Sequence, residues 1–154
     1  MLASEIPVVH TPPGGWTVLP PPVLGGCTDP LVEGAIDMRG TWRVTTVQRP
    51  GGDWSTDDPM VGNVQRIEQC GDRVCITAGR IIHDMRADGT EEHGVDDVAE
   101  FDLTTRITVV CTFEDGVHVL RPVGIPIEVT RRLDGDDLIW SYVGLVARLE
   151  RVAP

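Results

Sequence analysis

Short runs in which apolar and polar residues alternate fill most of the chain after about residue 36, and they predict β-strands. Alternation with a period of two places successive side chains on opposite faces of a strand. Clusters of Gly, Pro, Asn, Asp and Ser, which are typical of turns, interrupt the runs at short intervals. No window favours an amphipathic helix. The expected strands are 37–49, 63–69, 74–78, 80–86, 95–103, 107–113, 117–121, 125–133, 138–143 and 145–152.

The turns between these runs are tight enough to join neighbouring antiparallel strands. Gly71-Asp72 and Thr104-Thr105 are two turn candidates, and Asp-Gly pairs follow 87, 114 and 133. Asp-Gly between alternating apolar runs is among the strongest hairpin signals. A meander of about nine or ten short strands hides its edges best by closing on itself. We therefore predict an all-β fold, an antiparallel up-and-down β-barrel of about 8–10 strands formed by residues 36–154.

Residues 1–35 have a different composition and are predicted to form an extended N-terminal arm. The proline and glycine clusters at 12–15, 20–22 and 25–26 exclude regular helix or central strand. The segment nevertheless carries apolar residues, among them Trp16, which a disordered linker would carry less often. We expect the arm to pack over the outside of the barrel or across one mouth. A mobile leader is the alternative, and the position of Trp16 distinguishes the two.

Composition and charge exclude several classes of function. The 154 residues fit one domain, and the net charge of −11 argues against nucleic-acid binding. The chain has no lysine, which excludes a Schiff-base lysine and a phosphate-loop lysine. No apolar run reaches the roughly 20 residues of a membrane-spanning helix, so no membrane insertion is expected. The N-terminus lacks the pattern of a secretory signal, which predicts a cytoplasmic protein.

The four cysteines are predicted to be free thiols, as a cytoplasmic location favours. They are Cys27, Cys70, Cys75 and Cys111, and no pair has the Cys-x-x-Cys spacing of a zinc site. Cys70 and Cys75 flank a predicted hairpin turn, so a local disulfide between them stays open. No metal and no cofactor are expected, because the acidic run 96–102 splits between two strand faces.

The two ends of the predicted barrel carry residues that suit neighbouring strands. Gly40 and Trp42 lie in the first strand, and Arg148 and Arg151 lie in the last. If these strands pair, one of the arginines is expected to lie across the indole of Trp42.

The Gly40-Thr41-Trp42 sequence resembles the Gly-x-Trp signature of the calycin superfamily, which includes lipocalins and fatty-acid-binding proteins. The run from Arg106 to Glu150 is similar to the closing strands of the intracellular fatty-acid-binding proteins. This resemblance implies a barrel around a cavity for a lipid or another hydrophobic molecule. Where that family has an Arg-x-Tyr pair for the ligand carboxylate, this chain has Arg148-Leu149-Glu150. The glutamate would repel an anionic head group, which puts fatty acid itself in doubt.

Further candidate ligand-binding residues follow from strand alternation. Arg131 shares a face with Ile125, Ile127 and Val129, and an internal arginine would bind a carboxylate or need Glu150 as its partner. Trp140 and Tyr142 share a face and offer flat contacts to a planar apolar ligand.

A histidine provides the one candidate for catalysis. His83 alternates with Ile81 and Met85 on a face that should be apolar, and a buried imidazole near a carboxylate can act as a general base. His118, between Val117 and Val119, is expected to point outward.

Three functions remain open. The first is binding of a small hydrophobic ligand, lipid-like or planar, in the barrel, with Arg131 or Arg148 fixing any polar end and Met85, Trp140 and Tyr142 in contact. The second is a cofactor-independent isomerase, cyclase or hydratase that uses His83 as base in the same cavity. The third is a ligand-free structural or interaction module, with the barrel filled by its own side chains and a homodimer formed through the arm.

Overall fold

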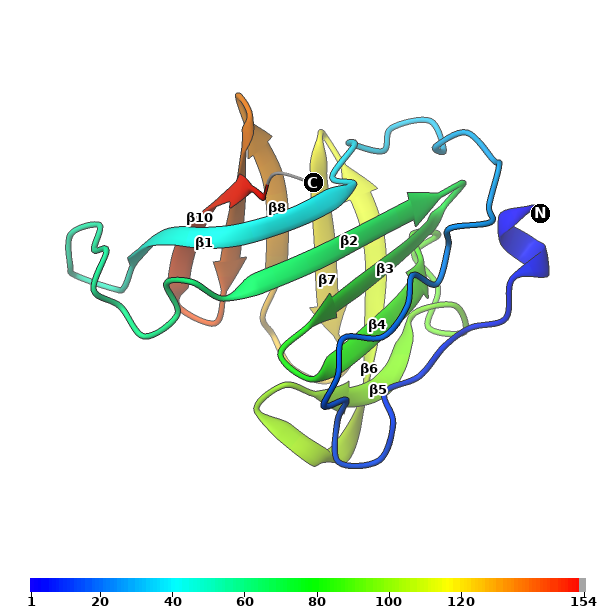
Figure 1. Ribbon diagram of the computed structural model, residues 1–154, viewed down its shortest axis with the longest axis horizontal. Coiled ribbons are helices and arrows are strands. Elements are labelled where there is room, and N and C mark those ends of the chain that lie inside the picture. The colour runs from blue at the N-terminus through cyan, green and yellow to red at the C-terminus, as the bar shows by residue number, and fades with distance from the viewer. Residues whose placement is uncertain (153–154) are drawn as a thin grey trace.

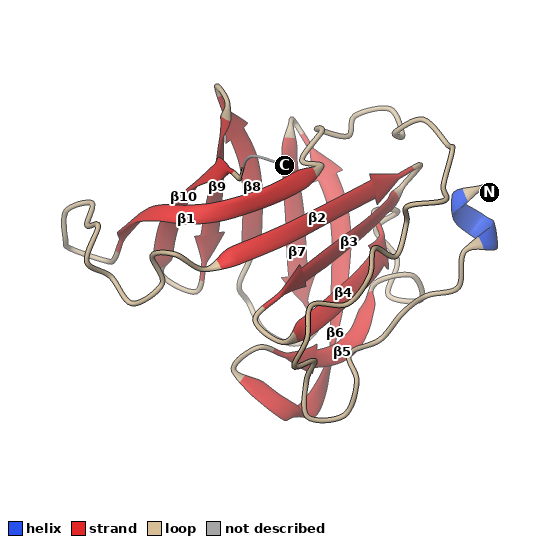
Figure 2. Cartoon of the chain, in the orientation of Figure 1, coloured by secondary structure: helices blue, strands red, loops and turns tan. Residues whose placement is uncertain are grey.

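The computed structural model describes residues 1–152, and nearly all of its regular structure is β-strand (Figure 2). Residues 153–154, which close the predicted barrel domain, lie outside the described residues. In the described part no helix has the length and apolar character needed to cross a membrane. The elements are the short 3-10 helix η1 (Ala3–Glu5) and the strands β1 (Gly40–Gln48), β2 (Val64–Cys70), β3 (Arg73–Ala78), β4 (Ile81–Arg86), β5 (Val95–Ala99), β6 (Asp102–Glu114), β7 (Val117–Pro122), β8 (Val129–Asp134), β9 (Asp137–Tyr142) and β10 (Leu145–Arg151).

All ten strands form one antiparallel sheet, in the order β4-β3-β2-β1-β10-β9-β8-β7-β6-β5. Every strand pairs with its neighbour along the chain except β4 with β5, and β1 pairs in addition with β10. In Figure 1 the sheet curls so that β1, β2 and β3 cross over β6, β7 and β8. The result is the predicted up-and-down barrel, nearly closed, with its first and last strands side by side.

The two edge strands, β4 and β5, leave a seam in the barrel wall. No ladder of backbone hydrogen bonds joins them in the described chain. Two contacts bridge the seam instead. His83 Nε2 on β4 lies 2.7 Å from the carbonyl oxygen of Val98 on β5, and the Arg86 amide donates to the carbonyl of His93 at 2.8 Å. The barrel is therefore weakest at this seam, because side chains and a single backbone bond replace a regular ladder.

The contact between the chain ends has a specific chemistry. The Arg151 guanidinium lies 4.3 Å from the centre of the Trp42 ring, whose Nε1 donates to the carbonyl of Met38. Gly40 has a φ of 138°, and a Cβ at this position would collide with the Arg151 guanidinium. A glycine is therefore needed two residues before the tryptophan. Arg148, the other candidate for this role, lies elsewhere.

Two regions differ most from the sequence prediction. Thr104-Thr105 does not form a turn, because both residues lie within β6, the longest strand. The chain turns earlier, at Glu100 and Phe101, and a bulge at Val98 and Ala99 accompanies that turn. The predicted strand 125–133 begins only at Val129. Residues 123–128 form a loop, although several of them are β-branched. Strand propensity depends on the packing around a residue, so β-branched residues alone do not produce a strand.

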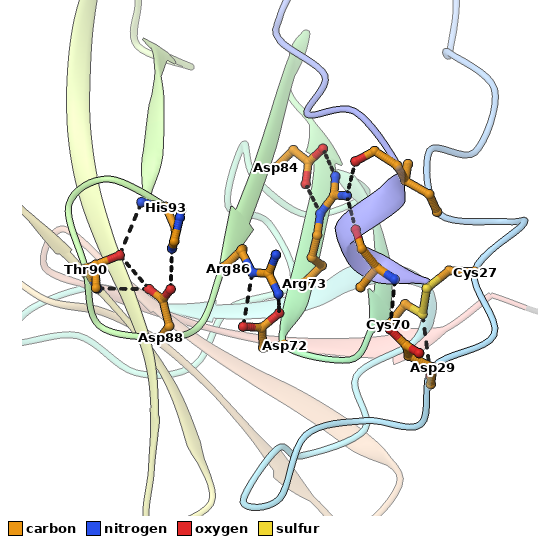
Figure 3. Close-up of polar contacts among 12 residues, drawn as sticks. Cys27, Asp29, Cys70, Asp72, Arg73, Asp84, Arg86, Asp88, Thr90 and His93 are labelled. Carbon is orange, nitrogen blue, oxygen red and sulfur yellow. Dashed lines mark hydrogen bonds and ion pairs between the residues drawn. A yellow bond between two sulfur atoms is a disulfide. The ribbon is translucent and has the colours of Figure 1, made fainter. Parts of the chain in front are cut away.

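The N-terminal segment runs along the outside of β2, β3 and β4 (Figure 1). A disulfide joins Cys27 to Cys70 with a Cα–Cα distance of 6.2 Å (Figure 3). The prediction of four free thiols is thus wrong for this pair, and Cys70 does not pair with Cys75. Cys75 and Cys111 are free and buried. The sequence did not predict this disulfide, because the irregular segment around Cys27 has no periodic pattern from which its position in the fold could be inferred.

A buried ion pair anchors the same segment. The Arg73 guanidinium contacts Asp84 at 2.5 Å and donates to the carbonyl oxygens of Ala3 and Ile6 (Figure 3). Asp84 in turn accepts the amide of Val9. Both charged side chains are nearly inaccessible. Each remaining polar atom of the pair is used by the N-terminal backbone, which is what a buried ion pair requires.

Candidate functional site

The barrel encloses a cavity of about 120 Å³, here called the inner cavity. Its walls come from β2 to β9, and strand alternation turns the apolar side chains of these strands inward. The apolar lining includes Ile76, Ile107, Val109, Leu120, Ile127 and Val129. The polar or charged lining is confined to Gln65, His83, Glu100 and Arg131, with the polar tips of Trp140 and Tyr142. The interior is therefore not packed solid.

A second cavity of about 380 Å³, the outer cavity, adjoins the first. The two share Gln65, Ala78, Glu100 and Trp140 in their walls, so they lie side by side. Trp16 of the N-terminal arm forms part of the outer wall.

Arg131 on β8 places a cation in the apolar interior. It is 5% exposed, and its Nε and Nη2 donate to Gln65 Oε1 at 3.2 and 3.1 Å. Its Nη1 is buried without a hydrogen-bond partner in the described chain. Burial lowers the pKa of the guanidinium to about 10, so the group stays charged at neutral pH. The predicted partner, Glu150, is on the outside, and the prediction of that pair is wrong. A buried cation satisfied only in part can receive an acceptor atom from a ligand.

Two aromatic residues flank the guanidinium. Trp140 and Tyr142 on β9 stack with ring centres 5.0 Å apart, and the Arg131 guanidinium lies 5.3 Å from the Trp140 ring. Both aromatic residues line the inner cavity. The indole Nε1 of Trp140 is buried and has no partner among the described residues. The arrangement presents two donors, Arg131 Nη1 and Trp140 Nε1, beside flat apolar surfaces.

His83 lines the inner cavity, as alternation predicted, but its contacts differ from those of a general base. Its Nε2 must donate to the Val98 carbonyl, because a carbonyl oxygen only accepts. Burial lowers the pKa of the imidazole. The Asp97 carboxylate accepts hydrogen bonds from the backbone amides of Thr11 and Val98. No carboxylate in the described chain hydrogen-bonds to His83, so the base–carboxylate pair of the enzyme hypothesis is not assembled here.

His118 was predicted to point outward, and that prediction is wrong. The side chain is completely buried, and its Nε2 lies 3.1 Å from Cys111 Sγ. Arg131 is its register partner on β8. Burial first, and the Arg131 charge second, lower the pKa of His118 to about 3. β7 is apolar on both faces, so a period of two could not assign the histidine. Its shared face with the cavity residue Leu120 was the one available signal.

The buried His118 predicts a stability loss in acid. Its folded pKa is below the unfolded value of about 6.5, so its stabilising contribution is complete above pH 6.5 and declines as pH falls towards 3. Between pH 6 and 4.5 this group should remove about 2 kcal/mol from the free energy of unfolding. Urea unfolding of wild type and His118→Leu at both pH values measures the difference. Equal pH slopes in the two proteins would contradict the assignment.

Other predicted ligand-binding residues lie outside the cavities. On β10 the side chains of Leu145, Ala147 and Leu149 are buried, which turns Arg148 and Glu150 to the outer face. Arg148 bonds to Asp134 and Asp137 at 2.9 Å, and Glu150 is exposed. The predicted ligand contacts of both are wrong in position.

Met85 faces inward as expected. It is buried within the barrel core and does not line either cavity.

One group of potential metal ligands occurs in the described residues, and it is already engaged. Cys27, Asp29 and Cys70 lie close together, but the two sulfurs form the disulfide. Asp29 accepts the amide of Ala3 at 2.8 Å (Figure 3). The cluster serves to attach the N-terminal segment to β2.

Comparison with known proteins gives information about the fold alone. No protein-family model matches the chain, and no curated protein sequence matches it. Among solved structures, human cRBP IV, a cellular retinol-binding protein, is similar, with a TM-score of 0.61 and 17% sequence identity. The match covers 76% of this chain and 99% of that protein. The likeness is one of fold: the described strands of this chain form a nearly closed antiparallel barrel.

Proposed function

We propose that the chain binds a small hydrophobic ligand inside the barrel and that Arg131 holds a carboxylate or carbonyl at one end of it. The observation that carries the proposal is the Arg131 guanidinium, buried in an apolar cavity with Nη1 unpartnered. A charged donor left unsatisfied in an apolar site destabilises the empty protein. An acceptor atom of a ligand would relieve that cost and gain a charge-assisted hydrogen bond.

The fold supports this choice in general terms. The similar human protein is named as a retinol-binding protein, which favours a hydrophobic ligand for this barrel too. The polar contacts favour an acid or carbonyl over a hydrocarbon, because Arg131 and Trp140 both present donors. The objection raised by Glu150 does not apply, since that carboxylate lies on the outer face. A fatty acid or another apolar acid is therefore the preferred ligand class.

Native mass spectrometry of the purified protein, followed by organic extraction, tests the proposal directly. We expect an extra mass that is released by solvent and identified as an apolar acid or carbonyl compound. Delipidated protein should then bind dodecanoic acid by calorimetry at least about tenfold more tightly than methyl dodecanoate, because the ester carbonyl can accept a hydrogen bond from Arg131 but lacks the negative charge of the carboxylate. Equal affinities for acid and ester would contradict an ion pair between Arg131 and a ligand carboxylate, and no binding of either would contradict the proposal as a whole.

A further inference from the structure

The carboxylate of Glu100 lies where the inner and outer cavities adjoin, and none of the contacts described so far involves it. Glu100 lies in the turn between β5 and β6 and lines both cavities. Although solvent reaches it through the opening, enough protein surrounds the carboxyl that burial raises its pKa. Glu100 is exposed, and Asp97 is the acidic residue of the run 96–102 that is buried.

The turn opposite Glu100 is shaped to receive its side chain. Gly79, between β3 and β4, has a φ of 48°, and a Cβ at this position would collide with the Glu100 carboxyl group. The side chain therefore reaches across the seam and lies over the glycine backbone. Arg131 lowers its pKa through its charge alone, and no described residue donates a hydrogen bond to the carboxylate. Because Glu100 is exposed, water can hydrate the carboxylate in the empty protein, and a donor group of a ligand at the entrance would replace that water.

The arm completes the site on the other side. Trp16 donates from its backbone amide to the Arg80 carbonyl and from Nε1 to the Ile81 carbonyl, both at 2.9 Å. These two bonds fix the indole along the edge of β4, where it forms a wall of the outer cavity together with Trp140. The outer cavity is thus built before a ligand arrives, which reduces the entropy cost of binding.

We propose that the outer cavity is a second ligand subsite, in which Glu100 accepts a hydrogen bond from a hydroxyl or amine group of the ligand between Trp16 and Trp140. This inference rests on the proposed function, since it adds a contact to a ligand whose apolar body fills the inner cavity. The preferred ligand accordingly carries a hydrogen-bond donor in addition to the group that contacts Arg131. Simple saturated acids then leave the contact with Glu100 unused.

A matched pair of ligands tests the donor. 1-Dodecanol can donate a hydrogen bond, whereas dodecyl methyl ether has the same chain and only accepts. The ratio of their two dissociation constants should favour the alcohol in wild type and fall about tenfold in Glu100→Ala, as expected for the loss of a hydrogen bond to a charged group. Solvation differences between alcohol and ether cancel when the variant is compared with wild type.

Glu92→Ala is the control, because Glu92 is an exposed acid of the β4–β5 loop that lines neither cavity. Trp16→Ala should weaken alcohol and ether alike. An unchanged ratio in Glu100→Ala overturns the inference, and a ratio that changes equally in Glu92→Ala does so too. Dodecanoic acid keeps the two proposals separate: if it still binds through Arg131, only the second subsite fails, whereas failure of acid, alcohol and ether together removes the proposed function.

Discussion

Replacing Arg131 with methionine is expected to weaken binding of dodecanoic acid about 100-fold, because a charge-assisted hydrogen bond in a desolvated site is lost. The unfolding free energy of the ligand-free protein should stay the same or rise by about 0–2 kcal/mol. The variant removes a cation whose burial already lowers its pKa to about 10 and whose bonds reach only the neutral Gln65. Methionine fills similar space without a charge to desolvate. Calorimetry and urea unfolding measure the two quantities on the same preparations.

The matched control is Arg148→Met. Arg148 contacts Asp134 and Asp137 on the outer face, so its loss should leave acid binding unchanged and alter stability by less than about 1 kcal/mol. A binding loss of similar size in both variants would show a general effect of net charge. A large destabilisation by Arg131→Met would mean that the guanidinium is there to support the barrel, in which case the functional argument fails.

The residues that sequence reasoning placed well are those whose surroundings are set by local periodicity. Arg131 alternates with Val129, so the sequence placed the two side chains on one face, although it left open whether that face was internal. The contact made by Gly40 and Trp42 could be predicted from the sequence for another reason. Closure of a meander brings its first and last strands together, and few residue types fit the resulting contact with Arg151.

The wrong predictions concern residues whose strand alternation was given less weight than a family motif, or residues for which no alternation exists. On β10, the alternation of Leu145, Ala147 and Leu149 already favoured an outward Arg148, but the similarity to a family motif was given more weight. On β7, apolar residues on both faces removed the signal for His118. Glu100 was missed because its position depends on contacts across the seam. Such contacts join residues far apart in sequence, and no local rule reports them.

Opening the Cys27–Cys70 disulfide is expected to lower the free energy of unfolding by about 4 kcal/mol, the chain-entropy value for a loop of this size. The bond spans 43 residues and ties the arm to β2. Urea unfolding of wild type with and without dithiothreitol measures the effect, and Cys27→Ser/Cys70→Ser should match the reduced protein and ignore the reductant. Cys75 and Cys111 cannot account for a response to reductant, because they are already free thiols.

The Cys27–Cys70 disulfide should also determine how firmly the N-terminal arm covers the seam between β4 and β5. Thr11 connects the arm to both edges, through Ile82 on β4 and Asp97 on β5, and Trp16 walls the outer cavity. Once the tether at Cys27 is open, we expect the release rate of a bound alkyl ligand to rise along with the loss of stability. An oxidising environment keeps the disulfide closed and a reducing one opens it, so the redox conditions should set the exchange rate. A reduced protein that unfolds and releases ligand like the oxidised one would refute this dependence, because the buried contacts of Arg73 and Asp84 would then hold the arm without help.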